Sequence, residues 1–159
     1  MAAMTFDVKD DKGVQVFKLK GAIDEKADFT KLVGLSTASL AIDFEAVENV
    51  NSTGIKKWIA MLGDLKGKNV TYERCPTVVI ESVNMVPALR DGVNVNSFFL
   101  PFFCASCDLE LTKLVVRSEA TATGFIEGIN DRYPCERCNR KLRFFDDESL
   151  YFAFLETAS

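Results

Sequence analysis

Residues 40–62 have the sequence LAIDFEAVENVNSTGIKKWIAML, and this stretch contains a strand, a polar turn and a helix in succession. The apolar run 40–44 has the length of a buried strand. After the turn, apolar side chains recur at three- and four-residue steps and mark one helical face, ending near Gly67: Ile55, Trp58, Ile59, Leu62 and Leu65. A strand followed by a helix across a short connection is typical of an α/β fold.

The rest of the first hundred residues repeats this alternation. Two apolar segments, 5–8 and 14–19, flank the turn 10–13 and predict a hairpin that opens a sheet. The further predicted elements are a helix over 25–36, a strand over 69–74, a helix around Val79, Val83 and Val86 that ends or kinks at Pro87, and a strand over 93–100. The pattern predicts an α/β fold with a mixed, mostly parallel sheet and helices.

The character of the sequence changes after Pro101, where four of the five cysteines lie. A chain of 159 residues holds one domain with room for a small second one. We therefore expect an α/β domain over 1–100 and a small β module over 101–159. The segment 98–103 is too apolar for a free linker, and we expect it to continue a strand from one domain into the next. A short helix with a docked apolar face is expected to follow Asp146 at the end of the chain.

Two C-x-x-C pairs predict a metal site. Cys104 and Cys107 form the first pair, and Cys135 and Cys138 form the second. Two such turns supply the four tetrahedral sulfurs that zinc prefers at about 2.3 Å. The intervening segment 108–134 is longer than the roughly 15–20 residues usual for this signature. We expect a long hairpin, with 109–117 paired to 125–133, to absorb the excess. The alternatives are disulfides and free core thiols. A reducing cytosol disfavours disulfides, and chance rarely gives two such pairs.

A site with four cysteines leaves no open coordination position, so the expected cofactor is one structural Zn²⁺ per chain. The metal would supply folding energy to a module too small to bury a large core. Five basic residues surround the second cysteine pair: Arg132, Arg137, Arg140, Lys141 and Arg143. They have two interpretations, which are compensation of the negative charge of the thiolates and contact with nucleic acid beside Phe144 and Phe145.

The turn between the strand 40–44 and the following helix contains Asn51, Ser52 and Thr53. All three residue types cap helices by accepting hydrogen bonds from free backbone N–H groups. A hydroxyl at a helix N-terminus is also a favourable position for phosphate, because the helix dipole stabilises the added charge. We expect the helix to present Lys56 and Lys57 outward beside buried Ile55, Trp58 and Ile59.

The order of these elements resembles the STAS domain over residues 5–100. The resemblance is carried by VQVFKLKGAID at 14–24, by LAIDF at 40–44 and by NSTGI at 51–55. This is the fold of bacterial anti-sigma-factor antagonists and of the tails of sulfate transporters. In that family, the first hydroxyl residue of an Asp-Ser-(Ser/Thr)-Gly turn is phosphorylated by a partner kinase. Ser52 matches that position and Thr53 the next, whereas Asn51 replaces the usual Asp. The tail resembles a zinc ribbon, and the joined arrangement resembles small bacterial STAS-like proteins.

The composition excludes several functional classes. The chain has 0 histidines, which removes Ser-His and Cys-His catalysis and imidazole acid–base chemistry. We therefore expect no enzyme, although an enzyme could draw on Asp43, Glu45 and Glu48. The net charge of −4 argues against bulk capture of nucleic acid. No apolar run reaches the roughly 18–20 residues of a membrane span, and the acidic first residues do not form a secretory signal, so we expect a cytoplasmic protein.

The resemblance and the composition together predict a non-enzymatic bacterial regulatory module that binds a protein partner. The resemblance implies a kinase or an anti-sigma-like regulator as that partner. Two alternatives involve the C-terminal module. It could bind nucleic acid through residues 137–143, or it could sense oxidants by releasing zinc as its cysteines oxidise.

Overall fold

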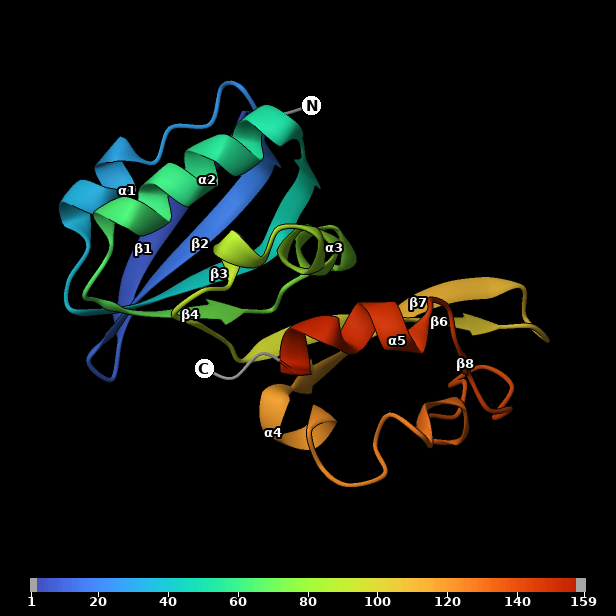
Figure 1. The fold of residues 1–159 in the computed structure, drawn as a ribbon. Helices are drawn as coiled ribbons and strands as arrows, with labels where there is room; N and C mark the ends of the chain where they lie inside the picture. The colour runs from blue at the N-terminus through green and yellow to red at the C-terminus, as the bar shows by residue number, and fades with distance from the viewer. Residues whose placement is uncertain (1–2, 157–159) are drawn as a thin grey trace.

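The computed structural model describes residues 3–156, which form two sheets. The first sheet has five strands in the order β1-β2-β3-β4-β5, and the second has three in the order β7-β6-β8 (Figure 1). This arrangement confirms the predicted fold class: a mixed α/β sheet with helices, followed by a small β module that ends in a short helix.

The first sheet is mixed and mostly parallel, as predicted. Strands β1 (Thr5–Asp11) and β2 (Val14–Ile23) form an antiparallel hairpin. Lys12 and Gly13 close it with positive φ angles of 51° and 84°. Strands β3 (Ser39–Val50), β4 (Asn69–Glu73) and β5 (Val93–Val95) then add in parallel, each beside its predecessor.

Three helices accompany the sheet: α1 (Thr30–Leu35), α2 (Ser52–Asp64) and α3 (Thr77–Met85), and the last is followed by the short 3₁₀ helix η1 (Pro87–Leu89). Figure 1 shows α1 and α2 side by side over the first strands. Helix α1 is shorter than the predicted helix over 25–36. The Asp24 and Asp28 side chains accept hydrogen bonds from the backbone two residues onward, each at 2.9 Å, which keeps this segment in turns.

An aromatic cluster joins α2 to the sheet. Phe44, Trp58 and Tyr72 are almost completely buried, and their ring centroids lie 5.0–5.7 Å apart. Trp58 donates its indole N–H to the Tyr72 hydroxyl at 3.0 Å, and that hydroxyl donates to the carbonyl of Leu89 at 2.5 Å. Both polar groups therefore have partners despite their burial, so the cluster fixes α2 and η1 against the strands.

The second sheet differs from the predicted long hairpin. Strand β6 (Ser97–Cys104) pairs antiparallel with β7 (Leu109–Val116) along its whole length and with β8 (Arg143–Phe144) on its other edge. The segment predicted to pair with β7, 125–133, instead contains turns and the 3₁₀ helix η2 (Ile129–Asp131). It lacks the alternation of apolar residues that β6 has, with Phe98, Leu100 and Phe102 buried, so β6 is the better partner.

Strand β6 links the two sheets. The predicted continuous strand over 98–103 lies within β6. The start of β6 is hydrogen-bonded to buried Cys75, which follows β4 of the first sheet. Cys75 N–H donates to Ser97 O at 3.1 Å, and Phe99 N–H donates to Cys75 O at 2.8 Å. The core is accordingly one continuous apolar cluster that extends from the first sheet into the C-terminal module.

The described part of the chain ends in α5 (Glu148–Tyr151) and the 3₁₀ helix η3 (Phe152–Glu156), which follow the single-turn α4 (Arg117–Ala120). The cap is Asp147 and not Asp146, because the Asp147 carboxylate accepts the Ser149 N–H at 2.9 Å. As predicted, the apolar face docks: Phe154 packs edge-on against Phe98 with centroids 4.9 Å apart, although Leu150 remains exposed.

Candidate functional site

The start of α2 is built around Asn51, which is the helix cap. Its side-chain oxygen accepts the Gly54 N–H at 2.8 Å, and its own N–H donates to the carbonyl of Ile23 at the end of β2, at 3.1 Å. Ser52 and Thr53 occupy the first turn and are exposed. Within residues 3–156, neither hydroxyl makes a hydrogen bond, so capping does not use them.

Asn51 also binds the preceding loop. Its amide nitrogen donates to Glu25 Oε2 at 3.0 Å. The pKa of Glu25 lies below its usual value, first because of a backbone hydrogen bond and second because of the Asn51 amide. A carboxylate therefore stands next to the turn even though position 51 carries none.

Two expectations about the surface of α2 are wrong. Lys57 does not point into solvent: its ammonium group donates to the carbonyls of Glu25 at 2.5 Å and Ala27 at 3.0 Å, and so ties the loop to the helix. Ile59 is 37% exposed, because the buried face of α2 is formed by Gly54, Trp58 and Met61. Lys56 is exposed, as expected.

Gly54 allows the helix to begin directly against β2. A Cβ atom at this position would lie 1.9 Å from the carbonyl oxygen of Ile23. No side chain fits at that separation, so the glycine of the Ser-Thr-Gly turn is required by the close approach of two backbones.

The four predicted cysteine ligands converge. Their Sγ atoms all lie within 4.8 Å of one another, with Cys104 and Cys138 3.5 Å apart and Cys107 and Cys135 4.0 Å apart. Four sulfurs bound to a tetrahedral zinc at about 2.3 Å would be separated by about 3.8 Å. The cluster can therefore hold a metal ion, and its dimensions fit Zn²⁺.

The two cysteine turns share one backbone conformation. The residue after the second cysteine of each turn has a positive φ, which is 51° at Asp108 and 62° at Asn139. Asp and Asn are among the few non-glycine residues that adopt this conformation readily. Backbone N–H groups of Arg137 and Cys138 lower the pKa of Cys135 to about 7, so the second turn is arranged to stabilise a thiolate.

The basic residues near the cluster are partly committed to other contacts. Arg132 lies over the Phe125 ring, 4.5 Å from its centroid, and Lys141 contacts Asp131 at 3.3 Å. Arg140, Lys141 and Arg143 line a shallow pocket of about 270 Å³ beside Cys104. This position beside Cys104 fits charge compensation of the sulfurs.

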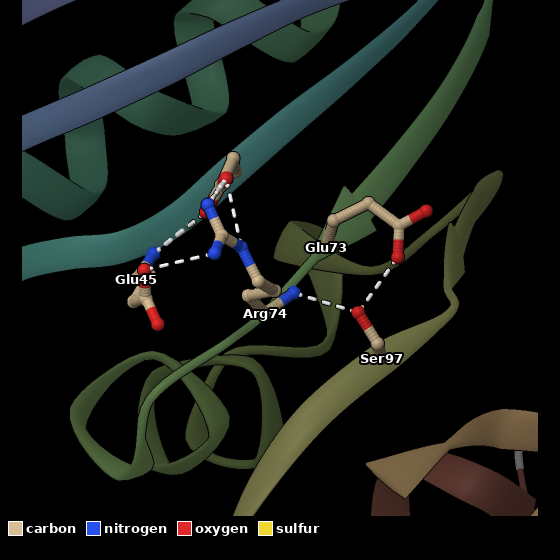
Figure 2. A network of polar contacts seen from close by, with 5 residues as sticks. Glu45, Glu73, Arg74 and Ser97 are labelled. Carbon is tan, nitrogen blue, oxygen red and sulfur yellow. Dashed lines mark hydrogen bonds and ion pairs between the residues drawn. The ribbon is translucent and has the colours of Figure 1, made fainter. Parts of the chain in front are cut away.

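A polar network that the sequence did not predict joins β3, β4 and β6 (Figure 2). Arg74 donates to Asp43 through Nε at 2.9 Å and also through Nη2, and its Nη1 lies 2.9 Å from Glu45 Oε1. Ser97 accepts the Arg74 N–H at 2.8 Å and donates to Glu73 at 2.7 Å. Two of the carboxylates considered for catalysis, Asp43 and Glu45, are therefore held in ion pairs, and the third, Glu48, is exposed.

No family model and no curated protein sequence matches this chain. Among solved structures, the chain is similar to an anti-sigma factor antagonist from Mycobacterium paratuberculosis, with 25% sequence identity and a TM-score of 0.47. The match covers 58% of this chain and 86% of that chain. Among residues 3–156, no helix is long and apolar enough to span a membrane.

Proposed function

We propose that this protein is a non-enzymatic, cytoplasmic regulatory module that binds a protein partner through the exposed start of α2. We call this surface, formed by Ser52, Thr53 and Lys56, the α2 edge. The observation that supports it is that Asn51 provides the cap, which leaves both hydroxyls exposed and without hydrogen bonds among the described residues. The partner class, a kinase or an anti-sigma-like regulator, follows from the sequence resemblance.

The α2 edge is suited to control by phosphorylation at Ser52. A phosphate there would gain from the N-terminal end of a 13-residue helix, by a few tenths to about 1 kcal/mol. Lys56 lies four residues further on the same face and can pair with it. The added charge and bulk would clash with a partner surface that fits a bare hydroxyl. Thr53, the next residue, is the second candidate.

The C-terminal module has a stabilising role in this proposal, as a separate domain over 101–159 that follows the α/β domain over 1–100. Zinc is the proposed metal, since sulfur separations of 3.5 and 4.0 Å bracket the spacing of a tetrahedral zinc–thiolate site. Four protein ligands leave no position for substrate, and the ion pairs of Arg74 occupy Asp43 and Glu45. Both features favour binding over catalysis.

The experiment compares partner capture by the wild type with capture by Ser52→Asp and Ser52→Ala. Ser118→Asp is the matched control, because Ser118 is an exposed serine in the first turn of α4. Each protein is immobilised, and partners from native bacterial lysate are quantified by mass spectrometry and then re-tested as purified proteins. We expect Ser52→Asp to lose the partner, whereas Ser52→Ala and Ser118→Asp retain it. Equal capture by all four proteins contradicts the proposal.

The two alternative functions predict different results. A nucleic-acid-binding module would be retained on DNA or RNA in a salt-dependent manner, and neutralising Arg140 and Arg143 would abolish the retention. A redox sensor would release its metal at low peroxide concentrations while the α/β domain stayed folded. Either result, together with unchanged partner capture by Ser52→Asp, would replace the proposed function.

A further inference from the structure

A pocket of about 510 Å³ lies between the first sheet and the C-terminal module. Its lining combines the amino ends of β3, β4 and β5 with Arg117 at the start of α4 and Phe154 of η3. Figure 1 shows α4 and the C-terminal helical segment lying together beside the start of β6. Its volume falls within the roughly 300–1,000 Å³ typical of small-molecule sites.

Two arginines line this pocket without carboxylate partners. Within residues 3–156, neither Arg90 nor Arg117 forms an ion pair, whereas Arg74 and Arg132 do. The one carboxylate of the lining, Asp91, is exposed. The pocket therefore carries an excess of positive charge in a chain whose net charge is −4.

The guanidinium groups are positioned by backbone carbonyls and keep free donors. Arg90 donates through Nη1 to Val83 O at 2.8 Å, yet its Nε is buried and has no hydrogen-bond partner among the described residues. Arg117 makes only long contacts, at 3.5 Å to Val95 O and 3.4 Å to Leu155 O.

We infer that this pocket binds a phosphorylated small molecule. Two guanidinium groups match the charge of a phosphate monoester, which approaches −2 near neutral pH and has three acceptor oxygens. Asn69, Thr71 and Asn94 are among the lining residues and offer polar groups for the remainder of the ligand, while Phe154 supplies an apolar wall. A bound ligand would contact the first sheet together with α4 and η3 of the C-terminal module. The inference does not depend on the α2 edge, because no residue of that edge lines the pocket.

The test is a titration of the zinc-loaded full chain with glycerol 3-phosphate. Isothermal titration calorimetry measures the affinity, and amide chemical shifts locate the binding site. Succinate, a dicarboxylate, is titrated at the same ionic strength. We expect saturable binding of glycerol 3-phosphate with shifts at Thr71, Asn94 and Arg117. Arg90→Gln and Arg117→Gln should each weaken binding by about tenfold or more, whereas Lys31→Gln, which removes a charge from an exposed site, should not.

Several results would overturn the inference: no saturable binding by the wild type, equal weakening by Lys31→Gln, or succinate binding as tightly as glycerol 3-phosphate. Arg90→Gln loses the contact with Val83 O and can unfold for that reason. Circular dichroism identifies that case, and Arg117→Gln together with the wild-type shifts then decides the question.

Discussion

Asn51 uses both ends of its amide, and an aspartate could use only one. The oxygen caps α2 through Gly54 N–H, and the nitrogen donates to Glu25. An Asp at this position would keep the cap but set two carboxylates against each other. The departure from the Asp of the antagonist turn therefore has a local physical reason, which is the presence of Glu25.

Asn51→Asp should therefore affect stability differently in two backgrounds. In the wild type at pH 7, the substitution should lower the free energy of unfolding, whereas in Glu25→Gln it should not, because the glutamine amide can donate to the new carboxylate. Asn51→Ala removes the cap and should cost about 1 kcal/mol in either background. Urea unfolding followed by Trp58 fluorescence measures all of these variants.

The pH dependence supplies a second check on the same pair. The folded pKa of Glu25 is depressed, so the stability it contributes is present above its unfolded pKa and is lost as the pH falls through the folded value. The penalty of Asn51→Asp should therefore shrink as the pH is lowered from 7 toward the pKa of the carboxylates. A penalty that is the same at both pH values would show that repulsion from Glu25 is not its cause.

Gly54 and Gly63 lie in the same helix and predict opposite responses to alanine. At Gly54 a Cβ would meet backbone at 1.9 Å, so Gly54→Ala should destabilise the protein by about 2 kcal/mol or more. At Gly63 a Cβ would meet no atom of residues 3–156 within 4 Å, so Gly63→Ala should stabilise the protein by about 0.5–1 kcal/mol. Thermal and urea unfolding compare the two variants. A tolerated Gly54→Ala would mean that α2 does not start against β2 as described.

At the scale of elements, the two cysteine turns are the parts that the sequence predicts best. Their residue types and spacing are local, and the convergence of the four sulfurs follows from them. The long-range pairing was not predictable in the same way. The unusual length of the segment 108–134 was explained by a hairpin in which 109–117 pairs with 125–133. In the structure β7 pairs with β6 instead, because β6 offers the alternating apolar face.

Other elements show the same limit. The strands of the first sheet and helices α2 and α3 have strong periodic patterns and overlap the predicted segments. Two bounds were wrong: β3 continues past 44 to Val50, and the strand predicted over 93–100 is divided between β5 of the first sheet and β6 of the second. The helix predicted over 25–36 was too long, since α1 begins only at Thr30. The first residues of the predicted segment, 25–28, are held in turns by side-chain hydrogen bonds that compete with a helix. The Arg74 network joins residues from three strands, and Arg74 adopts a φ of 48°, which no local pattern indicates.

The left-handed residue of each cysteine turn gives a prediction for these elements. Asn139→Gly should leave stability and metal retention unchanged or improved, because glycine adopts the positive φ without strain. Asn139→Val should destabilise the turn by about 1–2 kcal/mol and speed metal loss to a chelator. Glu136→Val is the control, since Glu136 is exposed in the same turn and does not have a positive φ. Equal metal loss from both valine variants would contradict this role of Asn139.

At the scale of the whole molecule, two proposed domains share one apolar core. The C-terminal helix packs Phe154 on Phe98, and Tyr151 donates its hydroxyl to Phe99 O at 2.5 Å. Asn84 of α3 in turn donates to Tyr151 O at 2.9 Å. These contacts couple the modules, whereas the four cysteines of the proposed metal site all lie in the C-terminal module. Removal of one cysteine therefore tests how far the stability of the first module depends on the second.

The prediction is that removing one ligand unfolds the C-terminal module and spares the α/β domain. Protein purified without added zinc should carry about one equivalent of zinc per chain, and Cys135→Ser should carry little. Trp58 is the single tryptophan and is buried in the first module, so its emission reports that domain selectively.

In Cys135→Ser we expect Trp58 emission to stay at the short wavelength of a buried indole, because the first module remains folded. The urea midpoint of that module should be lower, since the packing of Phe154 and Tyr151 is lost. The amide signals of 101–156 should collapse toward random coil. Glu136→Ser keeps all four sulfurs and should behave as the wild type. Simultaneous loss of Trp58 burial in Cys135→Ser would show that the chain folds as one cooperative unit, in which the metal site stabilises the first sheet as well as its own module.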